Sequence, residues 1–216
     1  MAWNLAFYAR AYKSNIKVYT ERKLVLGAGA MGGSGAQGVE AQGVKAAESS
    51  ALRNVAFDLD AYVRRIRSGS CFVCAVVEGK PGYDLEQIVY EDEQHIAFLD
   101  RYPTMPGKVL VAPKTHVEHV VRDLDEDAYL RLMTIVRRIA LAVEQVVPSE
   151  RTYLLTLGSQ QGNSHLHWHI VALPPETPYE QQQYHALMTE NGVIPWTLEQ
   201  AVTLAHQLRT ALARRR

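Results

Sequence analysis

The chain has 216 residues, of which 47% are hydrophobic, and its 23 lysines and arginines are balanced by 23 aspartates and glutamates. This balance excludes polycationic proteins that hold a nucleic-acid backbone without local specificity, so we expect no nucleic-acid partner. Two cysteines are too few for a disulfide-stapled secreted scaffold and favour a reducing, cytoplasmic location. No stretch approaches the ~20 consecutive apolar residues of a membrane span, so we expect no membrane partner.

The first quarter of the chain differs in composition from the rest. Residues 27–50 are rich in glycine and alanine, which offer little side-chain area to offset the entropy of ordering. We therefore expect residues 1–54 to be a disordered extension and residues 55–216 to form the folded domain. The basic and aromatic residues 1–26 fit a docking arm, an organellar address or an upstream extension with Met31 as the alternative start.

The folded part begins with a short helix and three strands. Residues 57–70 have acidic side chains in the first turn and basic ones in the last, which predicts an amphipathic helix. Residues 88–90 and 95–99 are typical of two strands joined by a polar turn, and therefore of a hairpin. A third strand is predicted over residues 108–114, after a Pro-Gly pair.

A long helix and two more strands follow. Apolar residues recur at helical spacing over residues 125–147, and a proline ends this pattern. Strands are predicted over residues 152–158 and 165–173, and the C-terminal helix begins with a capping-box pair, Thr197 and Gln200. This order of elements favours an α+β domain with a mainly antiparallel five-stranded sheet, one long helix and a C-terminal helix.

Histidines occupy every second position of the last predicted strand. In a strand, His165, His167 and His169 share one face, because successive side chains alternate between faces. The outer two are then ~13 Å apart, which disfavours a single metal ion bound by all three. A neutral imidazole, abundant because the ordinary pKa is ~6.5, is a competent nucleophile toward phosphorus. His167 is the natural attacker between two assisting imidazoles; the alternative is a half-exposed polar strand without chemistry.

The segment HLHWHIVA resembles the His-x-His-x-His-apolar-apolar signature of the histidine triad (HIT) superfamily of nucleotide hydrolases and transferases. CFVC, IVYEDEQHIAFLD and PTMPGKVLVAPKTHVEHV follow the family's order, so the resemblance covers about residues 58–175. It implies a HIT-like fold that pairs as a homodimer through the long helix and the sheet edge. It also implies that His167 attacks the α-phosphate of a nucleotide to form a covalent nucleotidyl-histidine, with His165 and His169 assisting.

The resemblance also implies residues that hold the nucleotide. Asp100 matches the family's acidic residue that takes the ribose hydroxyls, although an acidic residue opening a turn explains it as well. Leu99, together with Phe98 and Ile88, would line the base pocket, but core packing accounts equally for their apolar character. Lys108 replaces a commoner histidine, and we favour a strand-edge charge over a phosphate contact.

The loop ahead of the histidines departs from the family pattern. It reads GSQQGNSH, with Gly162 where a hydroxyl residue often stands, so the resemblance does not identify the phosphate-binding residues. The candidates are polar residues of this loop, and amide groups are favoured because they can donate to phosphate oxygens. The amides preferred first are Gln161 and Asn163, and the full set is Ser159, Gln160, Gln161, Asn163 and Ser164.

Cys71 and Cys74 have the spacing of half a zinc site. The resemblance to bacterial HIT proteins adds His116 and His165 as the other two ligands of a structural zinc ion, with His119 as a rival for His116. The alternatives are two small buried residues that pack a turn, or a redox pair, for which the required sequence context is missing. We expect no organic cofactor.

The leading hypothesis is a nucleotide hydrolase that cleaves a phosphoanhydride or phosphoramidate of a purine nucleotide, of the diadenosine polyphosphate or AMP-conjugate type. A phosphorylase or nucleotidyl transferase of the same family is the first alternative; His169, often glutamine in transferases, favours hydrolysis. The second alternative is a noncatalytic, zinc-stabilised nucleotide-binding dimer. For Tyr179 and Trp196 we favour fastening of the C-terminal helix over stacking on a second base.

Overall fold

The computed structural model describes residues 54–214. The predicted disordered extension over residues 1–54 therefore lies, except for its last residue, outside the described part of the chain. No helix in that part is long and apolar enough to cross a membrane.

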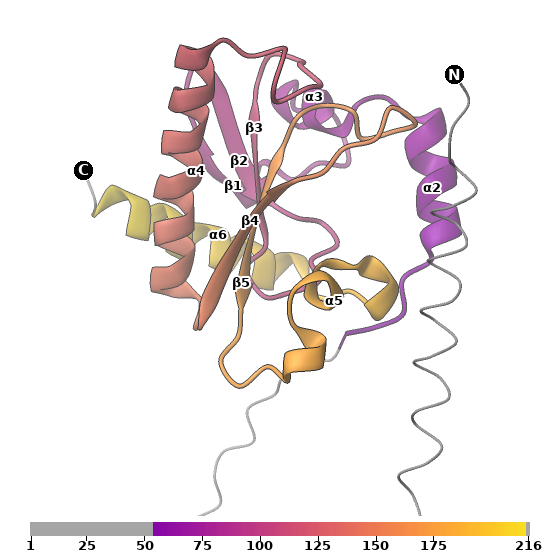
Figure 1. Ribbon diagram of the computed structural model, residues 1–216, viewed down its shortest axis with the longest axis vertical. Helices are drawn as coiled ribbons and strands as arrows, with labels where there is room; N and C mark the ends of the chain where they lie inside the picture. The colour runs from indigo at the N-terminus through magenta and orange to yellow at the C-terminus, as the bar shows by residue number, and fades with distance from the viewer. Residues whose placement is uncertain (1–53, 215–216) are drawn as a thin grey trace, which may run out of the picture. The chain divides into compact units, whose positions relative to one another are not determined.

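The domain is built on one sheet of five antiparallel strands (Figure 1). The strand order is β1-β2-β3-β5-β4, so β3 and β5 are central and β1 and β4 are the edges. Their bounds are β1 Ile88–Glu91, β2 His95–Leu99, β3 Val109–Pro113, β4 Arg151–Thr156 and β5 Trp168–Leu173. The predicted α+β class and five-stranded antiparallel sheet are confirmed.

The three longest helices begin where acidic or hydroxyl side chains cap free backbone N–H groups. The carboxylate of Asp125 accepts the N–H of Ala128 at the start of the long helix α4, and Thr197 and Gln200 form the predicted capping box. The α-helices are α2 Leu59–Ser68, α3 Phe72–Val77, α4 Glu126–Val146, α5 Tyr184–Leu187 and α6 Leu198–Ala213. Single 3-10 turns span Leu85–Gln87, Tyr179–Gln181 and Thr189–Asn191.

Both faces of the central strands are buried. On one face, the sheet packs against α4 and α6 in a cluster that includes Leu99, Val136 and Ile170. On the other face, α3 contributes Val73 to a smaller cluster with Phe98 and others. Figure 1 shows α4 on one side of the sheet and α3 on the other. This arrangement leaves the α3 side, beyond the small cluster, available for a pocket.

The triad segment enters the sheet later than its alternation predicts. Strand β5 begins at Trp168, and of the three histidines only His169 lies in the strand. The last pair of β3 and β5 is Val111 with Trp168; continuing this register would set Leu166 opposite Pro113, which has no N–H to extend the ladder. The N–H of Leu166 instead donates to the carbonyl of Val117 at 2.7 Å. The prediction of a strand from residue 165 is therefore wrong by three residues.

The sequence reasoning also missed helix α3, and it placed Tyr179 wrongly. Helix α3 has only six residues, FVCAVV, whose β-branched side chains disfavour an isolated helix, so packing on the sheet stabilises it. Trp196 packs against the cluster under α4 and α6, as expected for fastening. Tyr179, by contrast, is 77% exposed and fastens nothing in the described structure.

Candidate functional site

A pocket of about 1290 Å³ opens on the α3 side of the sheet. Its walls come from α2, α3, the end of β2, the segment before β3 and the loop ahead of β5. His167, His169 and Asp100 line it together, so chain segments far apart in the sequence meet here. The pocket is therefore the candidate active site.

His167 is held in one tautomer by the backbone. Its Nδ1 lies 2.7 Å from the carbonyl oxygen of His165, which can only accept, so Nδ1 carries the proton and Nε2 keeps its lone pair. The ring lies edge-on to Phe72, with centroids 5.3 Å apart, and is 4% exposed. Burial lowers the pKa of His167, which keeps the imidazole neutral at pH 7. These are the properties of a nitrogen nucleophile.

His169 stands next to His167, with ring centroids 4.8 Å apart. Burial, and after it the positive charge of Lys108, lowers the pKa of His169 to about 3. Its Nδ1 is buried and has no hydrogen-bond partner among the described residues. His169 itself lines the pocket, so its neutral ring can bond to a ligand there.

Asp100 and Lys108 form a buried ion pair at the floor of the pocket. Lys108 Nζ lies 2.9 Å from Asp100 Oδ2, and the backbone N–H of Tyr102 donates to Oδ1 at 2.9 Å. Burial alone would raise the pKa of Asp100, but Lys108 and this hydrogen bond hold it below its ordinary value. The interpretation of Lys108 as a strand-edge charge is wrong, because β3 is a central strand and Lys108 is buried.

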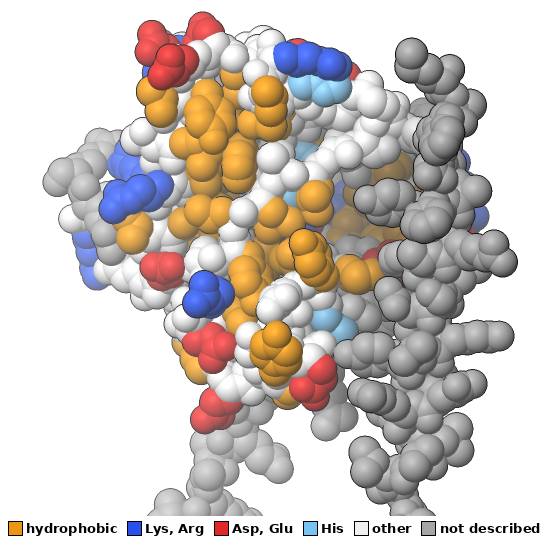
Figure 2. Space-filling model, in the orientation of Figure 1, with side chains coloured by type: hydrophobic (Ala, Val, Ile, Leu, Met, Phe, Trp, Pro, Cys, Tyr) orange, Lys and Arg blue, Asp and Glu red, His pale blue; other side chains and the backbone are white. Residues whose placement is uncertain are grey.

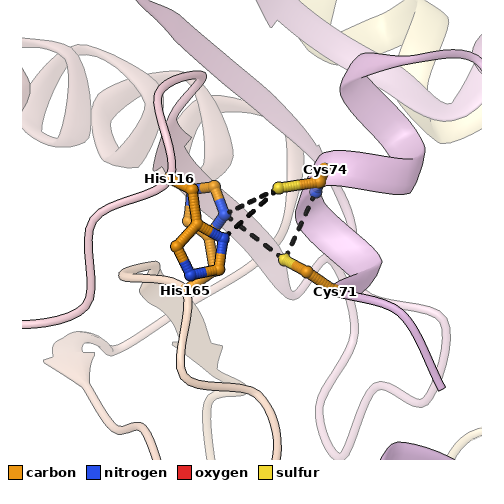
Figure 3. A group of neighbouring side chains, drawn as sticks. All are labelled: Cys71, Cys74, His116 and His165. Atoms are coloured by element: carbon orange, nitrogen blue, oxygen red, sulfur yellow. Dashed lines mark hydrogen bonds between the residues drawn. The ribbon is translucent and has the colours of Figure 1, made fainter.

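The four predicted metal ligands converge on one point (Figure 3). Cys71 caps the N-terminus of α3 and Cys74 lies in its first turn, whereas His116 comes from the segment after β3 and His165 from the triad. Their ligand atoms all lie within 4.8 Å of one another. Nδ1 of His165 is 3.4 Å from the Cys71 sulfur and 3.5 Å from the Cys74 sulfur, and Nδ1 of His116 is 3.4 Å from the Cys74 sulfur.

This cluster fits a tetrahedral zinc ion. Zinc–sulfur and zinc–nitrogen bonds of about 2.3 and 2.0 Å give a tetrahedron edge of about 3.6 Å, close to the observed separations. Nε2 of His165 lies 2.9 Å from the carbonyl of Pro113, and Nε2 of His116 lies 3.3 Å from Glu118. Both contacts place the proton on Nε2 and turn the lone pair of Nδ1 toward the sulfurs, as in metal-bound histidines.

His119, the rival ligand, lies outside the cluster; its Nε2 contacts the guanidinium of Arg122.

Burial and the neighbouring sulfur of Cys71 raise the pKa of Cys74 to about 11, so this thiol ionises at neutral pH only with a cation beside it. His165 belongs to the metal cluster by its ring and to the active site by its carbonyl, which orients His167.

The loop candidates fall into two groups. Gln160 donates to Glu118 at 3.2 Å and Gln161 accepts from Arg67 at 2.6 Å, and neither lines the pocket. Asn163 and Ser164 do line it, as does Ser159. Asn163 adopts a left-handed backbone with φ of 56°, and its Nδ2 donates to the hydroxyl of Tyr62 at 2.7 Å. The structure thus brings Asn163 and Ser164, but not the two glutamines, next to the histidines.

Phe98 and Leu99, both predicted to line the base pocket, do border it, and other pocket residues were not predicted. Phe98 faces α3 and contacts Phe72, with centroids 6.3 Å apart, whereas Leu99 borders the pocket but packs its side chain in the opposite cluster. Phe72 could have been found inside CFVC, beside the cysteines. Residues of α2 also line the pocket, and no sequence spacing connects that helix to the triad. They include Tyr62 and Arg65.

Comparisons with known proteins identify the family. The HIT domain family model matches residues 84–175. An uncharacterized HIT-like protein of Saccharolobus solfataricus is 37% identical over 111 residues, which cover 50% of this chain and 77% of that protein. The adenosine 5'-monophosphoramidase of Schizosaccharomyces pombe is 29% identical over 110 residues, or 50% of this chain and 77% of that enzyme.

A solved structure agrees with these sequences. The hypothetical histidine triad nucleotide-binding protein of Sulfolobus tokodaii superimposes with a TM-score of 0.54 at 26% identity. The match covers 67% of this chain and 93% of that one. The shared sequence and fold agree with the arrangement of the site, and the chain belongs to the histidine triad (HIT) family.

Proposed function

We propose that the protein is a hydrolase that cleaves a phosphoanhydride or phosphoramidate of a purine nucleotide through a covalent nucleotidyl-histidine on His167. The observation that carries this proposal is the hydrogen bond from Nδ1 of His167 to the carbonyl of His165, 2.7 Å long. It fixes a neutral imidazole with its Nε2 lone pair free at the pocket wall. The similarity to an adenosine 5'-monophosphoramidase supports AMP conjugates as substrates.

The reaction has two displacements at phosphorus. Nε2 of His167 attacks the α-phosphate, the bond from phosphorus to the leaving oxygen or nitrogen breaks, and the leaving group departs with the electron pair and takes a proton from water. The carbonyl of His165 stabilises the positive ring through Nδ1–H. Water then attacks phosphorus, the phosphorus–nitrogen bond breaks, and the nucleoside monophosphate and a proton are released.

The surrounding residues bind and orient the nucleotide. His169 and the polar side chains of Asn163 and Ser164, which line the pocket, bond to phosphate oxygens. Asp100 accepts from the ribose hydroxyls, because each carboxylate oxygen keeps a lone pair beyond those used by Lys108 and the N–H of Tyr102. The purine lies against Phe98 and its neighbours on the α3 side.

We further propose a structural zinc ion bound by Cys71, Cys74, His116 and His165. The fit of the donor atoms and the orientation of both imidazoles support it. When bound, the ion joins α3 to the segment before β5 and takes no part in the chemistry. Because His165 is fixed at its ring, its carbonyl is fixed against Nδ1 of His167.

Pairing of two chains through α4 and the sheet edge is part of the proposal. Figure 2 shows apolar side chains gathered over the face that carries α4 and β4. Leu130 of α4 is 53% exposed, and Leu154 of the edge strand β4 is 42% exposed. An unpaired strand edge beside exposed leucines favours association with a second copy. Analytical ultracentrifugation of wild type and Leu154→Glu tests this part.

Turnover of two substrates tests the proposed reaction. Diadenosine tetraphosphate and adenosine 5'-phosphoramidate are each incubated with wild type, with His167→Ala, and with His206→Ala, which removes an exposed histidine of α6 as a matched control. We expect AMP release by wild type and His206→Ala, and loss of at least about 10³-fold in His167→Ala. Release of a phosphorylated product only when inorganic phosphate is added would favour the phosphorylase alternative. AMP binding without turnover of either compound would favour the noncatalytic dimer.

A further inference from the structure

The pocket has a second aromatic wall, built mainly outside the residues that match the family model. Phe57, Tyr62 and Tyr102 contact one another, with ring centroids 5.1 to 5.8 Å apart, and we call them the aromatic platform. All three line the pocket. Two of them, Phe57 and Tyr62, precede residues 84–175, the segment that the HIT domain model matches.

Two arginines border this platform. The guanidinium of Arg65 lies 5.3 Å from the ring centre of Tyr62 and 5.4 Å from that of Tyr102. Arg101 lies 5.8 Å from the ring centre of Tyr102, and both arginines line the pocket. Arg65 is exposed, and no carboxylate forms an ion pair with it within residues 54–214. Its donors are therefore available to an anion.

The platform is joined to the reacting centre at two points. The hydroxyl of Tyr62 accepts from Asn163, in the loop just ahead of the triad, and the N–H of Tyr102 donates to Asp100. It differs from the wall of Phe72 and Phe98, which lies against His167. One pocket thus holds two aromatic walls, and its volume of about 1290 Å³ exceeds the ~300–1,000 Å³ of ordinary ligand sites.

We infer that the aromatic platform, with Arg65 and Arg101, is the binding subsite for the leaving group, and that this group carries several phosphates and a planar ring. The guanidinium groups take the phosphates and the platform takes the ring. A nucleotide with a small amine as leaving group occupies only the other wall. The inference rests on the proposed function, because the reaction defines which part of the substrate leaves.

Binding to a catalytically inactive protein tests this subsite apart from turnover. In His167→Ala, calorimetry measures the affinities for AMP, adenosine 5'-tetraphosphate and diadenosine tetraphosphate. Adding Arg65→Ala is expected to weaken the binding of the two tetraphosphates about 10- to 100-fold, as for a lost charge-assisted hydrogen bond. The binding of AMP should weaken less than twofold. Arg64→Ala, an exposed neighbour on α2 that does not line the pocket, is the matched control and should change none of them.

The second ring is tested by Phe57→Leu, which keeps an apolar side chain. We expect diadenosine tetraphosphate to bind more tightly than adenosine 5'-tetraphosphate, because it carries the second ring. In Phe57→Leu the ratio of these two affinities should fall about fivefold. Unchanged tetraphosphate affinities in Arg65→Ala, or equal losses for AMP, would overturn the subsite. Failure of wild type to turn over any substrate would refute the proposed reaction instead, while the affinities would still decide the subsite.

Discussion

The ion pair between Lys108 and Asp100 offers a measurable test of how the floor of the pocket is held. The side chains are 7% and 14% exposed, so removing Lys108 leaves a carboxylate with little access to water. Breaking a buried pair from one side costs about 3 to 5 kcal/mol, and the residual exposure of Asp100 places the expected loss for Lys108→Met near ~3 kcal/mol at pH 7. Urea unfolding followed by tryptophan fluorescence measures this free energy.

Two controls separate the buried charge from a general effect of losing a lysine. Lys114→Met removes a more exposed pair with Glu91, with side chains 24% and 48% exposed, and should cost less than about 1 kcal/mol. Asp100→Asn combined with Lys108→Met should be less destabilised than the sum of the single variants by about 2 kcal/mol, because no unpaired charge remains.

The free energy of unfolding should depend on pH with a definite sign. In wild type the lowered pKa of Asp100 contributes stability above its unfolded value of ~3.9, and this contribution is lost as the pH falls below that value. In Lys108→Met, burial without the lysine raises this pKa, so the difference from wild type should shrink as the pH is lowered from 7 toward 5. A loss of less than 1 kcal/mol in the free energy of unfolding of Lys108→Met at pH 7 would refute this reasoning. Strict additivity of the two substitutions in the double variant would refute it as well.

Three further predictions concern zinc, a glycine and the loop. Purified protein should contain about one zinc per chain by elemental analysis, and chelation or Cys74→Ser should lower Tm; an unchanged Tm after complete metal removal would exclude a structural role. Gly107→Ala should cost about 2 kcal/mol, because φ is +70° and a Cβ would lie 2.5 Å from Val147. Gly82→Ala, with φ of +92° but open space, should cost about half as much by urea unfolding. In kcat/KM, Asn163→Ala should lose about tenfold and Gln161→Ala less than twofold, since only Asn163 lines the pocket; equal losses would contradict the placement of the loop.

Much of the fold follows from local sequence signals. The long helix was predicted over residues 125–147 and spans Glu126–Val146, because its apolar spacing, its Asp125 cap and the proline after it agree. The hairpin of β1 and β2 and the capping box of α6 were equally local. The start of β5 could not be predicted, because it depends on long-range contacts: pairing with β3 ends at Trp168, and the N–H of Leu166 donates to Val117.

The residues of the candidate site also divide into those that the sequence marks and those that only the tertiary structure reveals. The three histidines, Asp100 and the four metal ligands could be named from the sequence, since their spacing or family resemblance marks them. The charge partner of Asp100 was missed, because the burial of Lys108 arises only when β3 becomes a central strand. The aromatic platform was missed as well, because the contact of its three rings with the pocket is purely tertiary.

The measurement that tests the central claim most directly is mass spectrometry of the trapped intermediate. Wild type and His167→Ala are mixed with diadenosine tetraphosphate or adenosine 5'-phosphoramidate and quenched in alkali, because a phosphorus–nitrogen bond to histidine is acid-labile. Intact-mass and peptide analysis should find one adenylate on the peptide containing His167, and none in the variant. Turnover by wild type with no adduct, or an adduct that persists in His167→Ala, would contradict covalent catalysis by this histidine.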